Sequence, residues 1–180
     1  MSPAIQITPV TRLPDGYLTS CDFGFQIARY AQPAFDTPID SWPLLPVTPF
    51  RKDYPLAPFV NEESETFLAR HRGEAVGHIT LSNNWNGYAL IEEIVVSAHV
   101  RRLGIATALL ETAKLWAQRH ETSGLMLETQ NTNLPACRCY QRFGFILGGI
   151  DHLLYRAHPD LADHEIALFW YLPFNSEMGY

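Results

Sequence analysis

The chain has 180 residues, 47% of them hydrophobic and 18% charged, with a formal net charge of −6 at pH 7. This length predicts one domain over residues 1–180 that can bury a core without disulfide staples. The acid excess excludes nucleic acid as an expected partner, because phosphate binding needs clustered lysines and arginines. No stretch approaches the roughly 20 apolar residues that cross a bilayer, and no signal peptide is visible. We therefore expect a cytoplasmic protein with no membrane partner.

The three cysteines do not make a disulfide framework. Cys137 and Cys139 form a C-x-C pair with no second pair, so we expect no metal site. We interpret both as packing residues on a helix. Reduced thiols fit the expected cytoplasmic location.

The N-terminal part of the chain carries weak patterns. Alternating apolar residues over 17–27 predict a strand. Residues 33–58 contain seven prolines, which predicts an extended, irregular segment rather than a helix. A long segment of this kind is either a lid or substrate wall, or a surface wrap without a role.

From residue 66 onward the patterns are regular. They predict a hairpin of 66–70 and 75–82, a strand at 88–96, an amphipathic helix at 105–119 and a strand at 125–129. A second helix at 134–143, ended by Gly144, and strands at 145–150 and 164–172 follow. This order predicts a mixed α/β sheet.

The first chemical motif is the connection between a strand and a helix, where Arg101, Gly104 and Ala106 occur as R-x-x-G-x-A. A helix start offers unpaired N–H groups and a positive dipole end, which bind phosphate. The dinucleotide fingerprint and the P-loop are absent, so NAD and ATP are disfavoured. The alternative is a tight strand-to-helix turn with no ligand.

The second motif lies on the helix predicted at 134–143. Asn133 is a plausible N-cap, and spacings of 3, 4 and 4 place Asn133, Ala136, Tyr140 and Gly144 along one helical face. That face presents an amide, a small residue and a phenol. The alternative is that the tyrosine only packs in the core.

Together, the two motifs resemble the GCN5-related N-acetyltransferase (GNAT) superfamily. Its patterns Q/R-x-x-G-x-G/A and N-x-x-A-x-x-x-Y-x-x-x-G-F match residues 101–106 and 133–145. The resemblance implies a central mixed, mostly antiparallel sheet that splays after its fourth strand and is flanked by helices. The GNAT core would span 64–172, with a divergent N-terminal part over 1–48.

Further stretches resemble the streptothricin acetyltransferases within that superfamily. Arg102 and Leu103 replace the commoner Gly-Lys of the turn but keep the glycine that follows. The matching stretches lie within 49–172 and include PFRKDY at 49–54, NWN at 84–86, LETQ at 127–130 and FWY at 169–171.

The resemblance implies direct transfer of acetyl from acetyl-CoA to a small cationic primary amine. The expected acceptor is the β-lysine amine of streptothricin, which would confer antibiotic resistance. The implied acetyl-CoA contacts are Ile94, Val95, Val96, Arg101, Arg102, Leu103, Gly104, Ile105, Ala106, Thr107 and Asn133.

Proton transfer is expected from two residues. Glu92 would accept the amine proton, directly or through water, and Tyr140 would protonate the departing thiolate. Strand alternation predicts Glu92 with Ile94 and Val96 on one face and Glu93 on the other, so only one glutamate can face the thioester. The resemblance favours Glu92, and Glu93 stays open as the alternative. The candidate substrate-binding residues are Glu93, Trp85, Asn86, Tyr54, Asp151 and Trp170.

Two other functions stay open. The same chemistry could act on a polyamine, an aminoglycoside or a protein amine, since acceptor sites drift more easily than coenzyme sites. A CoA-binding module without catalysis is the third hypothesis, and retention of both Glu92 and Tyr140 disfavours it. A homodimer is expected by family analogy alone.

Overall fold

The computed structural model describes residues 5–57, 62–157 and 165–174. Within these residues, nine strands form a seven-stranded sheet, in the order β1-β4-β5-β6-β7-β9-β8, and a two-stranded sheet of β2 and β3. The strands are β1 (Ile5–Val10), β2 (Phe25–Ala31), β3 (Leu44–Lys52), β4 (Ser64–His71), β5 (Glu74–Asn83), β6 (Ala89–Val96), β7 (Gly124–Gln130), β8 (Ile146–Asp151) and β9 (Ala167–Pro173). The helices are α1 (Tyr17–Ser20), α2 (Ile105–Arg119) and α3 (Leu134–Phe143), with short 3-10 turns η1 (Ile39–Ser41) and η2 (Ala98–Val100).

The described residues divide into two compact units. The first contains the segment up to Phe25, residues 53–125 and Phe174; the second contains residues 26–52 and 126–173. Each is described below by itself. In the described parts of the chain, no helix combines the length and apolar character needed to span a bilayer.

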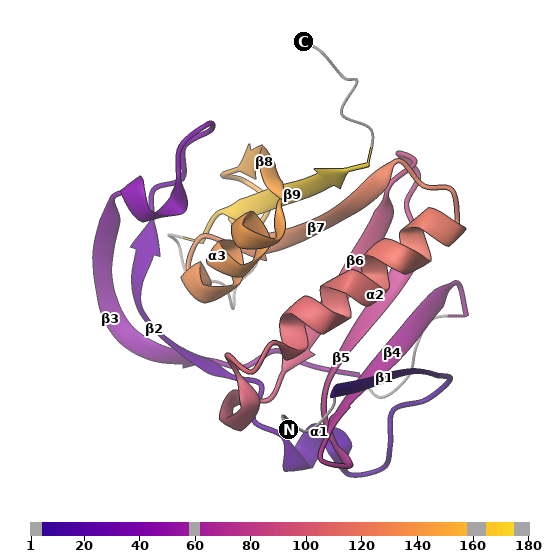
Figure 1. Cartoon of the computed structure of the whole chain (residues 1–180). Helices are drawn as coiled ribbons and strands as arrows, with labels where there is room; N and C mark the ends of the chain where they lie inside the picture. The colour runs from indigo at the N-terminus through magenta and orange to yellow at the C-terminus, as the bar shows by residue number, and fades with distance from the viewer. Residues whose placement is uncertain (1–4, 58–61, 158–164, 175–180) are drawn as a thin grey trace. The chain divides into compact units, whose positions relative to one another are not determined.

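Four antiparallel strands form the sheet of the first unit. β1 pairs with β4, β4 with β5, and β5 with β6. The predicted hairpin around 71–74 is confirmed, and its turn uses positive φ values of 53° at Arg72 and 84° at Gly73. Helix α2 lies across these four strands (Figure 1). The predicted strand at 88–96 is likewise confirmed as β6.

Helix α2 spans the residues that its periodicity predicted. Ile105, Leu109, Ala113 and Trp116 are all buried, so the apolar stripe is the packed face. The helix starts after Gly104, whose φ of 86° is accessible to glycine at little cost. Helix α3 also matches its prediction, from the Asn133 cap to Gly144 at φ 115°.

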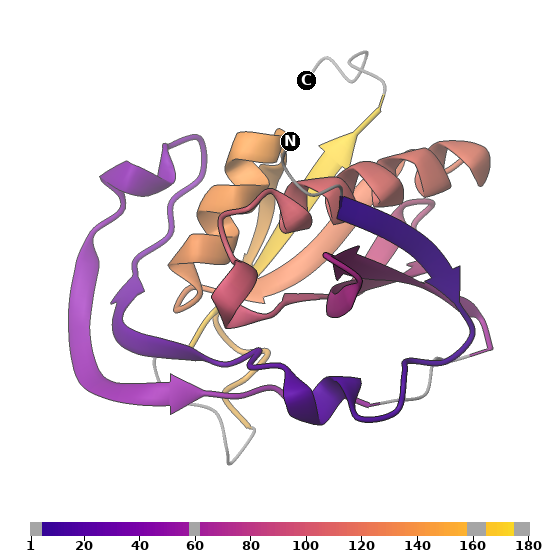
Figure 2. The same cartoon turned by 60° about the horizontal axis from the view of Figure 1, so that its bottom comes forward.

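The predicted strand over 17–27 is wrong in its first half. Tyr17–Ser20 is the helical turn α1, and the strand β2 begins only at Phe25. The hydroxyls of Thr19 and Ser20 donate to the carbonyls of Gly16 and Tyr17, which favours a turn over a strand. The apolar residues pack as a local cluster of Leu13, Tyr17, Phe23 and Leu68. α1 lies on the side of the sheet away from α2 (Figure 2).

The second unit contains α3, the antiparallel pair of β8 and β9, and the β2–β3 ribbon. The proline-rich segment 33–58 is less irregular than predicted, because β3 occupies Leu44–Lys52 and η1 precedes it. Pro46 and Pro49 are tolerated in β3 because a two-stranded ribbon leaves one edge of each strand unpaired. Position 58 lies outside the described residues.

The strand predicted at 164–172 is β9, which starts at Ala167, while residue 164 lies outside the described residues. β1 and β3 had no predicted counterpart. β1 alternates half-buried and exposed residues at an edge, so its apolar pattern is weak.

Candidate functional site

A β-bulge in β6 lies at the two glutamates. In the register with β5, Thr80 is opposite Glu93 and Leu81 is opposite Ile91, so Glu92 is the extra residue. A bulge of this kind changes the alternation of side chains along its strand. Glu92 and Glu93 therefore need not face opposite sides of the sheet, as a regular strand would require.

Both carboxylates lie on the same face. The Ser64 hydroxyl donates to Glu92 at 2.9 Å, and Glu93 contacts the His78 ring. Ser64 and Leu68 lie on one side of β4, and His78 is registered opposite Leu68. The predicted alternation is thus wrong, and the bulge is its physical cause. Ile94 and Val96 lie on the opposite face from the two acids, because Ile94 is registered opposite Ile79.

The two acids differ in their surroundings. Glu92 is exposed and accepts a hydrogen bond from the Ser64 hydroxyl. The side chain of Glu93 is 31% exposed and lies against a histidine that is 1% exposed. The Glu92 side chain is therefore open to a ligand, while the contact with the buried His78 ring restricts the Glu93 side chain.

The turn after β6 is fixed by backbone contacts. The Ala98 N–H donates to the Asp22 carbonyl at 2.7 Å. The Arg101 guanidinium donates to the carbonyls of Val96, Phe23 and Gly24 at 3.0–3.1 Å. Arg101 therefore orders the turn, in addition to any charge that it offers a phosphate.

The start of α2 is suited to an anion. Gly104 provides no side-chain cap, and Arg102 also has a positive φ, of 65°. The N–H groups of Ile105, Ala106 and Thr107 have no acceptor within an α-helix, and the helix dipole is positive at this end. Arg102, Leu103 and Gly104 are exposed, so a ligand can approach these amides. An exposed helix start of this kind is the type of site that binds phosphate groups in proteins.

The remaining candidates of the first unit lie in loops. Trp85 is 94% exposed at the β5–β6 turn, which leaves its ring available to a ligand. The side chain of Asn86 accepts from the Tyr88 N–H at 3.2 Å, so it shapes that turn. Tyr54 packs against Phe25 with ring centroids 5.9 Å apart.

In the second unit, Asn133 and Tyr140 lie on α3. The Asn133 side chain accepts from the Ala136 N–H at 3.3 Å, so it caps the helix as predicted. Tyr140 is buried, with its ring centroid 5.8 Å from Phe145 and 6.5 Å from Trp170. These ring contacts fix the orientation of the phenol.

Two predicted substrate residues of this unit have structural contacts. Trp170 is 1% exposed and stacks on Trp42, so its ring lies in the core rather than on an open wall. One carboxylate oxygen of Asp151 accepts from the N–H groups of Leu153 and Leu154 at 2.7 and 3.0 Å. Asp151 therefore shapes the turn after β8.

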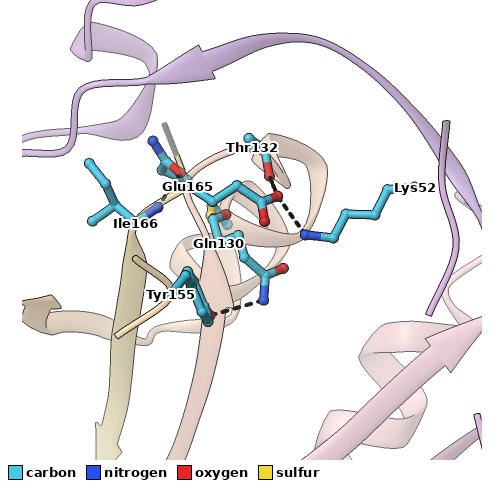
Figure 3. Close-up of polar contacts among 8 residues, drawn as sticks. Lys52, Gln130, Thr132, Tyr155, Glu165 and Ile166 are labelled. Atoms are coloured by element: carbon cyan, nitrogen blue, oxygen red, sulfur yellow. Dashed lines mark hydrogen bonds and ion pairs between the residues drawn. The ribbon is translucent and has the colours of Figure 1, made fainter. Parts of the chain in front are cut away.

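Within the second unit, a buried ion pair connects the end of β3 to Glu165, two residues before β9. Glu165, whose side chain is 2% exposed, accepts from Lys52 and from the Thr132 hydroxyl (Figure 3). Beside it, the Asn131 side chain donates to the Ala31 carbonyl and accepts from the Ile166 N–H. This polar cluster fastens the proline-rich segment to the β7–α3 connection.

Burial makes Cys137 unsuitable as a nucleophile. Desolvation raises the pKa of its thiol to about 12, which leaves almost no thiolate at neutral pH. Burial also raises the pKa of Cys139. In the described parts of the chain, no three His, Cys, Asp or Glu side chains gather closely enough to hold a metal ion.

Sequence reasoning missed His78, Tyr17, Lys52 and Glu165. The signal for His78 is a histidine inside the apolar run AVGHITLS. Lys52 is one of only two lysines in the chain and lies at the end of a proline-rich stretch. Neither signal identifies a partner, because Tyr17 is distant in sequence from His78 and Glu165 is distant from Lys52.

Several known proteins are similar to this chain. The model of a family described as the acetyltransferase (GNAT) family matches residues 27–145. Streptothricin acetyltransferase A of Bacillus subtilis (strain 168) is 44% identical over 117 residues, 64% of this chain and 66% of that protein. Streptothricin acetyltransferase of Escherichia coli is 44% identical over 125 residues, 69% of this chain and 71% of that protein.

Solved structures match over nearly the whole chain. A structure of a Bacillus anthracis (strain Ames) protein in complex with acetyl coenzyme A has a TM-score of 0.78 and 31% identity. The match covers 95% of this chain and 100% of that one. A nourseothricin acetyltransferase structure has a TM-score of 0.75 and 28% identity, over 94% of this chain and 98% of its own.

Proposed function

The chain belongs to the acetyltransferase (GNAT) family, and from that premise we propose that it acetylates the β-lysine amine of streptothricin with acetyl-CoA. The observation that carries the choice of acceptor is the 44% identity to the streptothricin acetyltransferase of Escherichia coli. The match to a structure described as a complex with acetyl coenzyme A supports the choice of acetyl donor. Resistance to the antibiotic would follow from this activity.

The coenzyme is proposed to bind along the end of β6 and the start of α2. Acetyl-CoA supplies an activated acetyl thioester. The first-turn N–H groups would hold its pyrophosphate, beside the charge of Arg101 and Arg102. The complete set is Ile94, Val95, Val96, Arg101, Arg102, Leu103, Gly104, Ile105, Ala106, Thr107 and Asn133. In this set, Asn133 would bind the pantetheine arm while it caps α3.

Glu92 is proposed to remove the proton from the acceptor. An amine with a pKa near 10 is mostly protonated at neutral pH and cannot attack a carbonyl in that form. The exposed Glu92 carboxylate can receive the proton directly or through water. Tyr140 would protonate the thiolate that leaves.

The acceptor is proposed to be a cation, since the bulge turns both Glu92 and Glu93 toward one face. Trp85 is the candidate with the most open ring. Asn86, Tyr54 and Asp151 are weaker candidates, because turn or ring contacts already engage each of them. Trp170 is the weakest, because it is buried.

Location and assembly complete the proposal. Three free cysteines support a cytoplasmic location. A homodimer is proposed from family analogy, and light scattering after gel filtration tests it, because a monomer has a mass of 20.4 kDa. A 20.4 kDa species at micromolar concentration would contradict a stable dimer.

An acceptor panel tests the proposed function. Purified protein, acetyl-CoA and one amine are mixed, and the release of free CoA thiol gives kcat/KM for streptothricin, a polyamine, an aminoglycoside and a peptide amine. We expect streptothricin to lead, and turnover to collapse in Tyr140→Phe. A higher kcat/KM for another amine would show that this amine, rather than streptothricin, is the preferred acceptor, while acetyl transfer to an amine would stand. Acetyl-CoA binding without turnover of any amine would favour a non-catalytic module.

A further inference from the structure

Three polar side chains, two of them buried and the third partly buried, form a hydrogen-bonded row from α1 to the bulge in β6. The Nδ1 atom of His78 lies 2.9 Å from the Tyr17 hydroxyl, and its Nε2 atom contacts the Glu93 carboxylate. Tyr17 is 3% exposed and His78 is 1% exposed. Burying these groups is costly unless they are hydrogen-bonded, so their alignment on one carboxylate is a specific arrangement.

The direction of the hydrogen bonds through His78 follows from its two partners, Glu93 and Tyr17. An ionised carboxylate only accepts hydrogen bonds, so the Nε2 atom of His78 must carry a proton. Burial is the main cause that raises the pKa of Tyr17 well above its usual value, with smaller contributions from Cys21 and Glu93. The phenol therefore keeps its proton and can donate to the Nδ1 atom of His78 when that atom carries no proton. The phenol then donates to the ring of His78, and the ring donates to Glu93.

The ring of His78 is also held in place by packing. Its centroid lies 5.6 Å from that of Tyr17 and 6.3 Å from that of Phe23, with both pairs close to perpendicular. Leu13 and Leu68 complete the apolar cluster around Tyr17. A ring fixed by hydrogen bonds and packing holds its Nε2–H at one position, and so holds the carboxylate that accepts from it.

We propose that His78 and Tyr17 are positioning residues that hold the Glu93 carboxylate as the docking point for the ammonium group of the acceptor. Glu92, one residue away on the same face, is left free to take up the proton. A division of this kind fits the contrast between the exposed Glu92 and the partly covered Glu93. The inference rests on the proposed amine acetylation.

Steady-state kinetics separates positioning from structure. Tyr17→Phe keeps the ring packing and removes the donor to His78. His78→Gln keeps an N–H near the Nε2 position, whereas His78→Leu removes it. The matched control is Thr66→Val, which breaks a buried hydroxyl pair with Thr80, 2.9 Å long, on the same sheet face. Each variant is also unfolded in denaturant to measure its stability.

Loss of docking should raise the KM of streptothricin and leave kcat and the KM of acetyl-CoA unchanged, because the lost binding is uniform. We expect a rise of about tenfold in Tyr17→Phe and about 10- to 100-fold in His78→Leu, with partial recovery in His78→Gln. Thr66→Val should lose similar stability without a change in KM. Calorimetric titration of streptothricin should reproduce the order of affinities.

Three results would overturn the proposal. If folded Tyr17→Phe and His78→Leu keep the acceptor KM of the wild type, the positioning role fails and the acetyltransferase proposal stands. If the 15N NMR spectrum of His78 shows a proton on Nδ1 and none on Nε2, His78 does not donate a hydrogen bond to Glu93, and the positioning role fails. If wild-type protein neither binds nor acetylates streptothricin or any amine of the panel, the proposed function fails and the docking role fails with it.

Discussion

Glu92 and Glu93 are consecutive residues on one face of β6, with different neighbours. Glu92 contacts the Ser64 hydroxyl on an open surface, and Glu93 contacts the buried His78. In a regular strand the two acids would face opposite sides of the sheet. The bulge places both on the same face, where two adjacent roles in one reaction become feasible: docking a cation and accepting its proton.

The two acids should therefore differ when each loses its charge. Glu92→Gln is expected to lower kcat for streptothricin about a hundredfold, because a proton acceptor is lost. Glu93→Gln is expected to raise the acceptor KM with a smaller effect on kcat. Steady-state kinetics with both substrates varied distinguishes them, and the reverse pattern would exchange the two roles.

Cys137 should be inert to alkylation in the folded protein. Its thiol is fully buried and its pKa is raised to about 12, so little thiolate forms at pH 8. Peptide mass spectrometry after brief iodoacetamide treatment should find Cys137 unlabelled, with Cys21 and Cys139 labelled slowly. In denaturant all three should react. Rapid labelling of native Cys137 would contradict its place in the core.

At the scale of elements, the turn from β6 into α2 decides coenzyme binding. Gly104→Ala places a side chain at φ 86°, which costs about 1 kcal/mol of stability and disturbs the first-turn amides. We expect the Kd of acetyl-CoA to rise about tenfold, the equivalent of roughly one hydrogen bond to a charged group. Calorimetric titration measures it.

Gly73→Ala is the matched control for this turn. Gly73 has a φ of 84°, and at both Gly73 and Gly104 a Cβ atom would meet no neighbouring atom within 4 Å. The two variants should lose similar stability, and only Gly104→Ala should weaken acetyl-CoA binding. Equal Kd values for acetyl-CoA in the two variants would show that the turn at Gly104 does not bind the coenzyme.

The Lys52–Glu165 pair should be the main polar support of the second unit. Lys52→Met leaves a carboxylate that is 2% exposed without its cation, which should cost about 3–5 kcal/mol of unfolding free energy. Asp40→Asn removes a surface pair with Arg138, in which the Arg138 side chain is 39% exposed and the Asp40 side chain 81%, and should cost under about 1 kcal/mol. Denaturant unfolding compares them, and equal losses would show that burial of the pair is unimportant.

The sequence allowed α2 and α3 to be predicted at their observed bounds, because an apolar stripe and a glycine at one end define each helix. It did not reveal α1, where the same apolar residues fit a strand and a helical turn packed on Leu68. The bulge at Glu92 was also out of reach, because it depends on pairing with β5. The contacts of His78 and Lys52 join residues 61 and 113 positions apart, which no local pattern reports.

At the scale of the whole molecule, two comparisons support acetyl transfer as the activity. The chain matches the acetyltransferase (GNAT) family model over residues 27–145, and the solved structure from Bacillus anthracis over 95% of its length. Both matches concern the family as a whole, whereas the acceptor is proposed from the identity to streptothricin acetyltransferases. The identity of the acceptor is therefore the central claim to test.

The most direct measurement is the identity of the product. Purified protein is incubated with streptothricin and acetyl-CoA carrying a 13C-labelled acetyl group, and the antibiotic is recovered for mass spectrometry and NMR. We predict one labelled acetyl group, attached to the β-lysine amine, and none when the protein is omitted. Recovery of unlabelled streptothricin from protein that binds acetyl-CoA would contradict the account.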